Sequence, residues 1–192
     1  MSNYESQILL LIRDIALNVK EFGHICPDNI AISFKKTRSD SEYGTWAEVS
    51  GLEWKNNCLC IRNGRVERYF ITDPFFINGN PVKYHIEFYM PRFINLSFRE
   101  KIITVFHELY HISPKFNGGL RLFPGKNYMH GKSVKEYDEY MAVLVDRYLK
   151  IKPECVCFLE SNLEQLQEKA GTLLKPTKYS LPKPMVFRMT LY

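Results

Sequence analysis

Two histidines and a glutamate stand at a spacing that can bring their side chains to one metal ion. They are His107, Glu108 and His111, in the sequence H-E-L-Y-H. On a helix, two histidines four residues apart project from the same face, one turn apart, so both imidazoles can reach one ion. Glu108 lies about 100° further round, near the ion but free to handle a proton. The spacing is typical of a zinc hydrolase.

Apolar residues surround this motif on nearly every side, which predicts a buried helix. They are Ile102, Ile103, Val105, Phe106, Leu109, Tyr110 and Ile112. A buried carboxylate beside two imidazoles is costly unless another group compensates it, and a metal ion would do so. The alternative interpretation is a hydrogen-bonded core cluster without metal.

Sequence signals also predict where the motif helix begins and ends. Ser97 with Glu100 forms a capping-box pattern, which places the start just after Asn95-Leu96. Pro114 disfavours helical geometry at Ser113, so the helix should end there or one residue earlier. The result is a helix of about four and a half turns with the histidines in its last third.

Zinc needs at least one more protein ligand, and a hydrolytic site keeps a further position open for water. His130 is the first histidine downstream, and it precedes a second predicted helix from Ser133 to about Lys150. The apolar stripe of that helix is Val134, Tyr137, Met141, Leu144, Val145 and Tyr148. We predict His130 as the third ligand and Asp138, at the edge of the stripe, as the alternative. Glu136, Glu139 or no third ligand remain further possibilities.

Asp138 has a second possible role. If His130 is the ligand, the Asp138 carboxylate could accept a hydrogen bond from an imidazole N–H and so orient a metal ligand. The other interpretation of Asp138 is an ordinary carboxylate on a helix.

The residues imply a mechanism of peptide hydrolysis. Zinc held by the three histidines would activate water and polarise the scissile carbonyl, and Glu108 would act as the general base. The tetrahedral intermediate needs one more positive or hydrogen-bonding group. Arg121, Tyr128 and Tyr137 are the polar candidates, and Arg121 follows the flexible Gly118-Gly119 turn, which could swing it over the site or expose it.

The motif and its surroundings resemble known metallopeptidases. The pattern His107 to His111, followed by His130-Gly131 and Tyr137, resembles the zincins, in particular the SprT-like group. The stretch H-E-L-Y-H-I-S-P-K-F-N-G-G-L-R resembles the phage metallopeptidases still more. The resemblance covers about residues 83–150. It implies an α+β, zincin-like fold in which a small mixed or antiparallel sheet packs on the motif helix and a second helix.

One difference from the SprT-like group limits what the resemblance implies about function. SprT proteins usually carry a zinc-ribbon or DNA-binding extension, whereas this sequence has no two-pair C-x-x-C pattern. A role in clearing DNA–protein crosslinks is therefore not supported.

The remaining elements follow from apolar patterns and turn residues. Ser2 with Glu5 opens an amphipathic helix that Pro27-Asp28-Asn29 breaks. Strands are predicted at residues 30–34, 46–49, 68–72 and 83–89. A short helix near residues 159–170 ends at Gly171, and residues 171–192 form an extended, proline-containing tail.

The strand from Lys83 to Tyr89 runs straight into the motif helix. In a zincin the edge strand of the sheet borders the cleft, and an extended substrate can add to it as another strand. We place residues 83–89 in that neighbourhood. His85 shares a face with Glu87 and Tyr89, which predicts a half-exposed strand residue outside the metal site.

Length and charge exclude several classes of protein. At 192 residues the chain has the length of a single domain, residues 1–192, and can bury its own core. No segment approaches the roughly 18 uninterrupted apolar residues of a membrane span. The N-terminus lacks the basic region of a secretory signal, which predicts a cytoplasmic protein. The net charge of +5 is spread along the chain, so nucleic acid is not expected as a partner and a solvated face is the default interpretation.

The five cysteines are Cys26, Cys58, Cys60, Cys155 and Cys157. An odd number in a chain without a secretory signal predicts free thiols. The two C-x-C pairs could hold a second, structural zinc if folding brought them together. In a strand, however, both thiols of such a pair share one face and commonly pack into the core.

Two functional hypotheses follow. The first is a zinc-dependent metallopeptidase that acts on a polypeptide. The second is a non-catalytic binding or regulatory module of a phage or mobile element, with the zincin fold and a structural metal. Intact Glu108 favours the first, because a purely structural site has no use for a general base beside the metal.

Overall fold

The computed structural model describes residues 4–37, 44–55, 58–63, 66–71, 73–125 and 127–161. Its fold is mixed α+β, in agreement with the predicted class. The α-helices are α1 (Tyr4–Asn18), α2 (Phe98–Tyr110) and α3 (Val134–Leu149), and the short 3-10 helices are η1 (Lys20–Phe22), η2 (Pro27–Asn29) and η3 (Glu154–Glu160). The strands are β1 (Ile30–Lys36), β2 (Ala47–Gly51), β3 (Glu53–Lys55), β4 (Cys58–Asn63), β5 (Val66–Ile71), β6 (Phe76–Ile77), β7 (Asn80–Pro81) and β8 (Tyr84–Met90).

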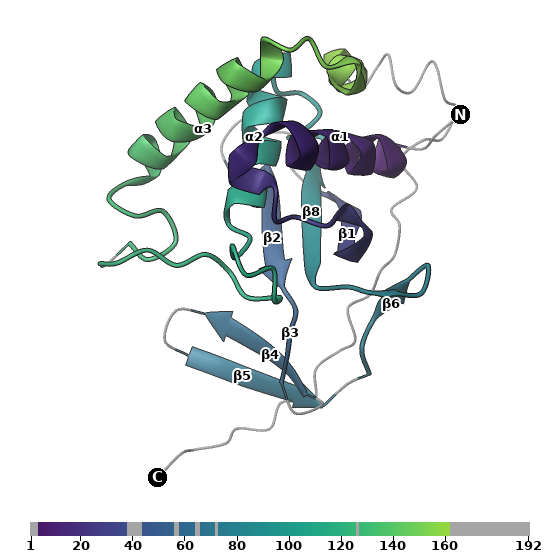
Figure 1. The fold of residues 1–192 in the computed structure, drawn as a ribbon, viewed down its shortest axis with the longest axis vertical. Helices are drawn as coiled ribbons and strands as arrows, with labels where there is room; N and C mark the ends of the chain where they lie inside the picture. Colours follow the sequence, from purple (N-terminus) through teal and green to yellow (C-terminus); the bar gives the residue numbers. More distant parts are fainter. Residues whose placement is uncertain are drawn as a thin grey trace.

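The main sheet has the strand order β1-β8-β2. It is mixed, because β1 runs parallel to β8 and β2 runs antiparallel to it. The placement of residues 83–89 at the cleft edge is therefore wrong: β8 is the central strand, and β2 is the edge strand beside α2 (Figure 1). Strand order depends on pairing between distant segments, which an apolar pattern does not encode.

The helices form two layers on the main sheet (Figure 1). α1 packs beside β1, α2 packs beside β2, and α3 packs on α2. The faces in contact are apolar, and their most buried members include Ile8, Ile12, Ile32, Phe88 and Phe106. Phe22 of η1 meets Phe106 of α2 edge-to-face, with ring centroids 5.1 Å apart. This core fixes α2 against the sheet.

The boundaries of α2 differ slightly from the prediction. Ser97 and Glu100 make the predicted capping box. The helix ends at Tyr110 with His111 as its C-cap, about one half-turn earlier than predicted. The reason is a contact with the loop that follows, since Ile112 pairs with Leu120 in an isolated antiparallel bridge and draws the chain out of the helix.

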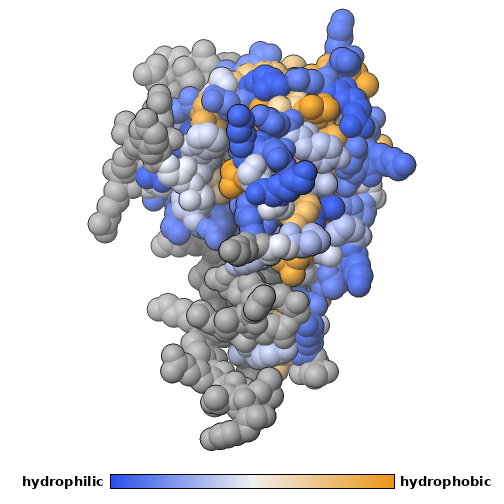
Figure 2. Space-filling view, turned by 90° about the vertical axis from the view of Figure 1, so that its left-hand side faces the viewer, coloured by the Kyte–Doolittle hydropathy of each residue, from blue (hydrophilic) through white to orange (hydrophobic). Residues whose placement is uncertain are grey.

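α3 matches its predicted range closely and begins at the N-cap Ser133. Its predicted apolar stripe is buried except for Val134, which is 49% exposed. Val134 occupies the first helical position, next to the N-cap Ser133. Seen from the side that carries α3, the surface is mostly hydrophilic with scattered hydrophobic side chains (Figure 2).

A second sheet, β3-β4-β5, lies at the far end of the molecule from the helices, and the β6-β7 hairpin lies beside the end of β8 (Figure 1). β3 follows β2 after a single residue, Leu52, so the edge strand of the main sheet leads directly into the second sheet. The sequence patterns did not predict β3 or β4. The predicted helix at residues 159–170 falls largely outside the described residues, and its first two residues belong to η3; the predicted tail at 171–192 also lies outside.

All five cysteines are free. Cys60 on β4 is buried and its neighbour Cys58 is partly buried, whereas Cys155 and Cys157 belong to η3. Within the described residues, the sole group of side chains that could hold a metal contains histidines and no cysteine. None of the helices in the described ranges has the length and hydrophobicity of a membrane span.

Candidate metal centre

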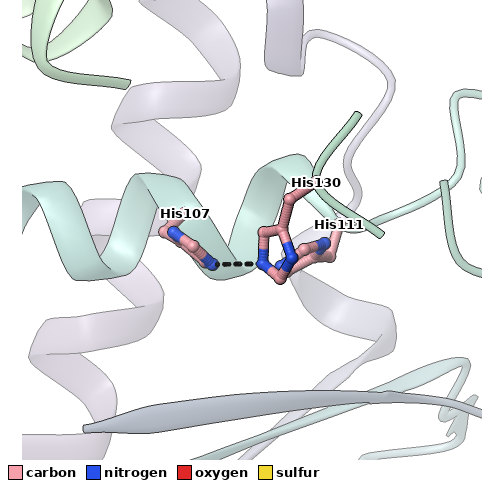
Figure 3. Close-up of side chains that lie close together, drawn as sticks. All are labelled: His107, His111 and His130. Carbon is pink, nitrogen blue, oxygen red and sulfur yellow. Dashed lines mark hydrogen bonds between the residues drawn. The ribbon is translucent and has the colours of Figure 1, made fainter. Parts of the chain in front are cut away.

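Three histidines from two segments meet at one point (Figure 3). α2 presents His107 and, at its C-cap, His111, while His130 comes from the connection between α2 and α3. One ring nitrogen from each histidine lies within 4.8 Å of the others, an arrangement that could hold a metal ion. The Nε2 atoms of His107 and His130 are 3.2 Å apart. Two imidazole nitrogens bound to one tetrahedral zinc lie about 3.3 Å apart, so this pair already has the required separation.

His130 owes its place to a compact turn. The backbone N–H groups of His130 and Gly131 both donate to the carbonyl oxygen of Asn127, at 3.3 and 2.8 Å. Gly131 has φ +72, a left-handed conformation that glycine adopts without a steric penalty. The Phe123 N–H donates to the Tyr128 carbonyl at 2.7 Å and closes the loop that precedes His130.

Asp138 orients one of the imidazoles. Its carboxylate lies 2.8 Å from His107 Nδ1, and it is not part of the histidine group. A carboxylate at this nitrogen favours the tautomer in which Nδ1 carries the proton, which leaves the Nε2 lone pair facing His130. The second role considered for Asp138, a hydrogen-bond acceptor behind a ligand, agrees with this geometry.

The surroundings keep the three imidazoles neutral. Burial lowers the pKa of His107, although Asp138 opposes the shift, and burial and the nearby His107 lower the pKa of His130. Burial lowers the pKa of His111 to about 3, with help from the two other histidines and Arg121. Only an imidazole nitrogen without a proton can donate a lone pair to a metal. The lowered pKa values therefore favour the form of the histidines that can bind a cation.

The donor set fits a transition metal such as zinc. His111 Nδ1 is buried and lacks a hydrogen-bond partner in the part of the chain that the structure describes. An unpaired buried nitrogen is unfavourable in an apoprotein, and a nearby cation or water would relieve it. Neutral imidazoles suit zinc, copper, iron and nickel, whereas magnesium and calcium prefer oxygen ligands.

Glu108 lies beside the cluster without belonging to it. Its side chain is 6% exposed, and the backbone of Val49 on β2 hydrogen bonds to its carboxylate. Burial raises the pKa of Glu108 to about 8, and this hydrogen bond only partly opposes the shift. A cation at the histidine cluster would favour the charged form of Glu108 and so lower this pKa.

The three candidates for stabilising an intermediate lie in different places. Arg121 Nε donates to the Tyr110 carbonyl at 2.7 Å, and its guanidinium lies over the Tyr110 ring, so the preceding glycines do not swing it over the histidines. The Tyr137 hydroxyl donates to the His107 carbonyl at 3.2 Å, and its ring stacks on His111. Tyr128 lines the cavity at the cluster.

The prediction of a half-exposed His85 is wrong, because this residue is 6% exposed. Its Nε2 lies 2.7 Å from Ser33 Oγ on the neighbouring β1, and this hydrogen bond allows the imidazole to be buried on the sheet. His85 lies outside the histidine group, as predicted.

The cluster opens into a cavity of about 460 Å³. One wall is residues 47–53, which include all of β2, and the opposite side carries residues 118–120 and 128–130. A second cavity of about 310 Å³ reaches His107 and Glu108 from the other end of β2 and is lined by residues 44–47. The sequence did not predict the wall that β2 forms. A strand at residues 46–49 is predicted, but no local signal places that strand at the edge of the sheet beside Glu108.

Comparison with known proteins identifies the family. The model of the family described as "Putative phage metallopeptidase" matches residues 5–149, which span α1 to the end of α3. The chain belongs to the phage metallopeptidase family. No curated protein and no solved structure matches the chain. The match contains all three histidines and Glu108, and the name of the phage metallopeptidase family implies a metal.

Proposed function

We propose that this protein is a zinc-dependent metallopeptidase with a zincin-like active site formed by His107, His111, His130 and Glu108. The observation that carries the proposal is the convergence of three imidazoles beside a buried carboxylate that stays outside their group. A cavity bordered by a sheet edge gives a polypeptide access to that point. The fit of the imidazoles to zinc supports the choice of metal.

The three histidines would hold the ion, and Asp138 would keep His107 in the ligating tautomer. When bound, zinc acts as a Lewis acid, which lowers the pKa of a water molecule and polarises a carbonyl group. Glu108 would accept the proton of the attacking water on its carboxylate and then deliver that proton to the leaving amine. The hydrogen bond from the Val49 backbone would hold the carboxylate in place during both transfers.

Tyr128 is our choice for the group that stabilises the intermediate. Of the three candidates it is the one that lines the cavity, whereas Arg121 and Tyr137 are engaged with backbone carbonyls of α2. A phenolic O–H can donate to a developing oxyanion, as other preorganised donors do.

The test is metal analysis combined with a casein and peptide digestion assay on the parent protein and Glu108→Gln. Both proteins should hold one zinc per chain, and the variant should lose activity by a factor of about 10²–10⁴, the usual contribution of a general base. Glu139→Gln, which changes an exposed carboxylate on α3, is the matched control and should behave as the parent.

A parent protein that holds one zinc but cleaves nothing over a broad peptide panel would support the alternative, a non-catalytic module with a structural metal. Loss of zinc in Glu108→Gln would also contradict the proposal, because it would make Glu108 a ligand rather than a base.

A further inference from the structure

One face of the main sheet carries polar side chains, whereas α1 and α2 pack on the other. The face towards the helices is apolar, and its members include Ile32 and Ile86. Alternate residues of the same strands point to the opposite side of the sheet. They include Ser33 on β1, Glu87 on β8 and Glu48 on β2, which lie at paired positions across the three strands. We call this side of the sheet the polar face.

The polar face is partly buried although it is turned away from α1 and α2. Ser33 is 4% exposed, and His85, which lies 2.7 Å from its hydroxyl, is 6% exposed. β1 is an edge strand, yet its first five residues are all buried. A small apolar cluster that contains Ala31, Leu52 and Leu59 covers the beginning of β1. Another segment is needed to cover Ser33, which lies further along the strand.

Two like charges face each other on the polar face. Glu48 and Glu87 are directly opposite in the antiparallel pair of β2 and β8, an arrangement that destabilises a sheet. Lys35 pairs with Glu87 at 3.3 Å. Glu48 accepts a hydrogen bond from the Tyr89 hydroxyl at 2.9 Å but forms no ion pair with a described residue. A second cation on the polar face would therefore be favourable.

The net charge of +5 is not spread along the chain but lies in residues 169–192. This stretch contains five lysines and arginines and no acidic residue, whereas residues 1–168 contain 21 residues of each sign. The five cations are Lys169, Lys175, Lys178, Lys183 and Arg188. We call residues 169–192 the basic segment. Its charge is complementary to the carboxylates of the polar face.

The last described residue, Ser161, lies within reach of the polar face. Three residues earlier, Phe158 of η3 meets Tyr4 edge-to-face, and Tyr4 meets Phe34 of β1 in the same way, with ring centroids 5.1 and 5.7 Å apart. η3 is therefore close to the end of the edge strand. Residues 162–168 can span about 23 Å when extended, and packed layers lie about 10 Å apart. The basic segment can therefore pass from the helix layer to the opposite side of the sheet.

We propose that the basic segment binds in cis to the polar face of the main sheet, where it covers Ser33 and places a lysine or arginine beside Glu48 and Glu87. The short link through residues 162–168 favours binding within one chain, because it gives the basic segment an effective concentration of about millimolar. The bound segment also supports β2, whose Glu48 lines the cavity at the histidine cluster. Binding of this segment requires neither a metal nor peptidase activity.

Cross-linking of the full chain tests where the basic segment lies. A zero-length carbodiimide reagent joins a carboxylate to a lysine amine only when the two are in contact. Mass spectrometry of the digested monomer should find Glu48 or Glu87 joined to a lysine of the basic segment. Glu139, an exposed carboxylate on α3, is the control and should not be joined to it. Links found only in cross-linked dimers would place the segment on a second copy and overturn binding in cis.

Hydrogen exchange of the full chain tests whether charge holds the segment in place. One variant removes three cations of the basic segment: Lys175→Gln, Lys178→Gln and Lys183→Gln. The control removes three exposed cations at and beside α3: Lys132→Gln, Lys135→Gln and Lys150→Gln. In the first variant, backbone amides of residues 30–36 should exchange at least about 10-fold faster than in the parent, because their cover is released more often. In the control they should exchange as in the parent. Equal exchange in both variants would overturn the proposal.

Discussion

The two segments that carry the three candidate metal ligands are positioned by different kinds of interaction. In α2, His107 and His111 are placed by the period of the helix, and the helix itself is fixed by its capping box and buried faces. The connection between α2 and α3, which carries His130, has no named helix or strand among its described residues. Local hydrogen bonds to Asn127 and Tyr128 form the turn at His130, and contacts with distant parts of the chain hold the first half of the connection.

Those contacts concentrate at Gly118 and Gly119. The Tyr84 hydroxyl donates to the Gly119 carbonyl at 2.8 Å and accepts from the Gly118 N–H at 3.0 Å. Gly118 also approaches the junction between β2 and β3 so closely that a Cβ atom there would overlap the Leu52 carbonyl group and the Glu53 Cα atom. The comparison teaches that the helix period alone places two of the candidate ligands, whereas the third needs both a local turn and a connection that is anchored by the tertiary fold.

Removing a ligand should have the largest effect. His107→Ala should weaken zinc binding more than His130→Ala, because the latter leaves two ligands preorganised on one helix. Each substitution should lower zinc affinity by more than the roughly 10–100-fold that is lost when a hydrogen-bond partner of a metal ligand is removed. Competition between the protein and a chelator for zinc measures both affinities. Parent-like affinity in His130→Ala, together with loss of zinc in Asp138→Ala, would make Asp138 the third ligand.

Gly118→Ala should have the next largest effect. It should destabilise the connection between α2 and α3. The new Cβ would collide with the backbone of Leu52 and Glu53, where β2 leads into β3, and the residue has φ +87, so we expect destabilisation of about 3 kcal/mol or more. Gly125→Ala is the matched control, with φ +103 and nothing within 4 Å, and should cost only about 1 kcal/mol of strain. Denaturant unfolding measures both. Equal costs would show that the contact with Leu52 and Glu53 is unimportant.

Asp138→Asn should lower zinc affinity, but by less than the removal of a ligand does. The amide keeps the shape of the side chain but loses the negative charge at His107 Nδ1, and zinc affinity should fall about 10–100-fold. Glu139→Gln, on the exposed side of the same helix, should leave the affinity unchanged. A parent-like affinity in Asp138→Asn would mean that packing alone orients the imidazole.

Tyr137→Phe should have the smallest effect. It removes the hydrogen bond to the His107 carbonyl and retains the stacking on His111, so stability should fall by about 1 kcal/mol. Peptidase activity of the metal-loaded variant should stay within a few-fold of the parent. A loss of kcat greater than about 100-fold would instead indicate that Tyr137 stabilises the intermediate.

The difference between local structure and tertiary contacts also explains which features the sequence could predict. The motif helix with its two histidines, its capping box and the second helix rest on signals within a few residues. His130 is predicted as the first histidine downstream, and the structure brings it to the other two. The edge position of β2 and the burial of His85 depend on partners far away in sequence, and the end of α2 at Tyr110 depends on the bridge between Ile112 and Leu120. Ser33, for example, is 52 residues from the His85 that it helps to bury.

The central claim is that three imidazoles bind one zinc ion while Glu108 remains uncoordinated. X-ray absorption at the zinc edge of the zinc-loaded protein counts and identifies the atoms bound to the metal. We predict three imidazole nitrogens at about 2.0–2.1 Å and one light ligand from solvent, with a spectrum unchanged in Glu108→Gln. Sulfur at about 2.3 Å, fewer than three imidazoles, or a shell that changes in Glu108→Gln would contradict the account.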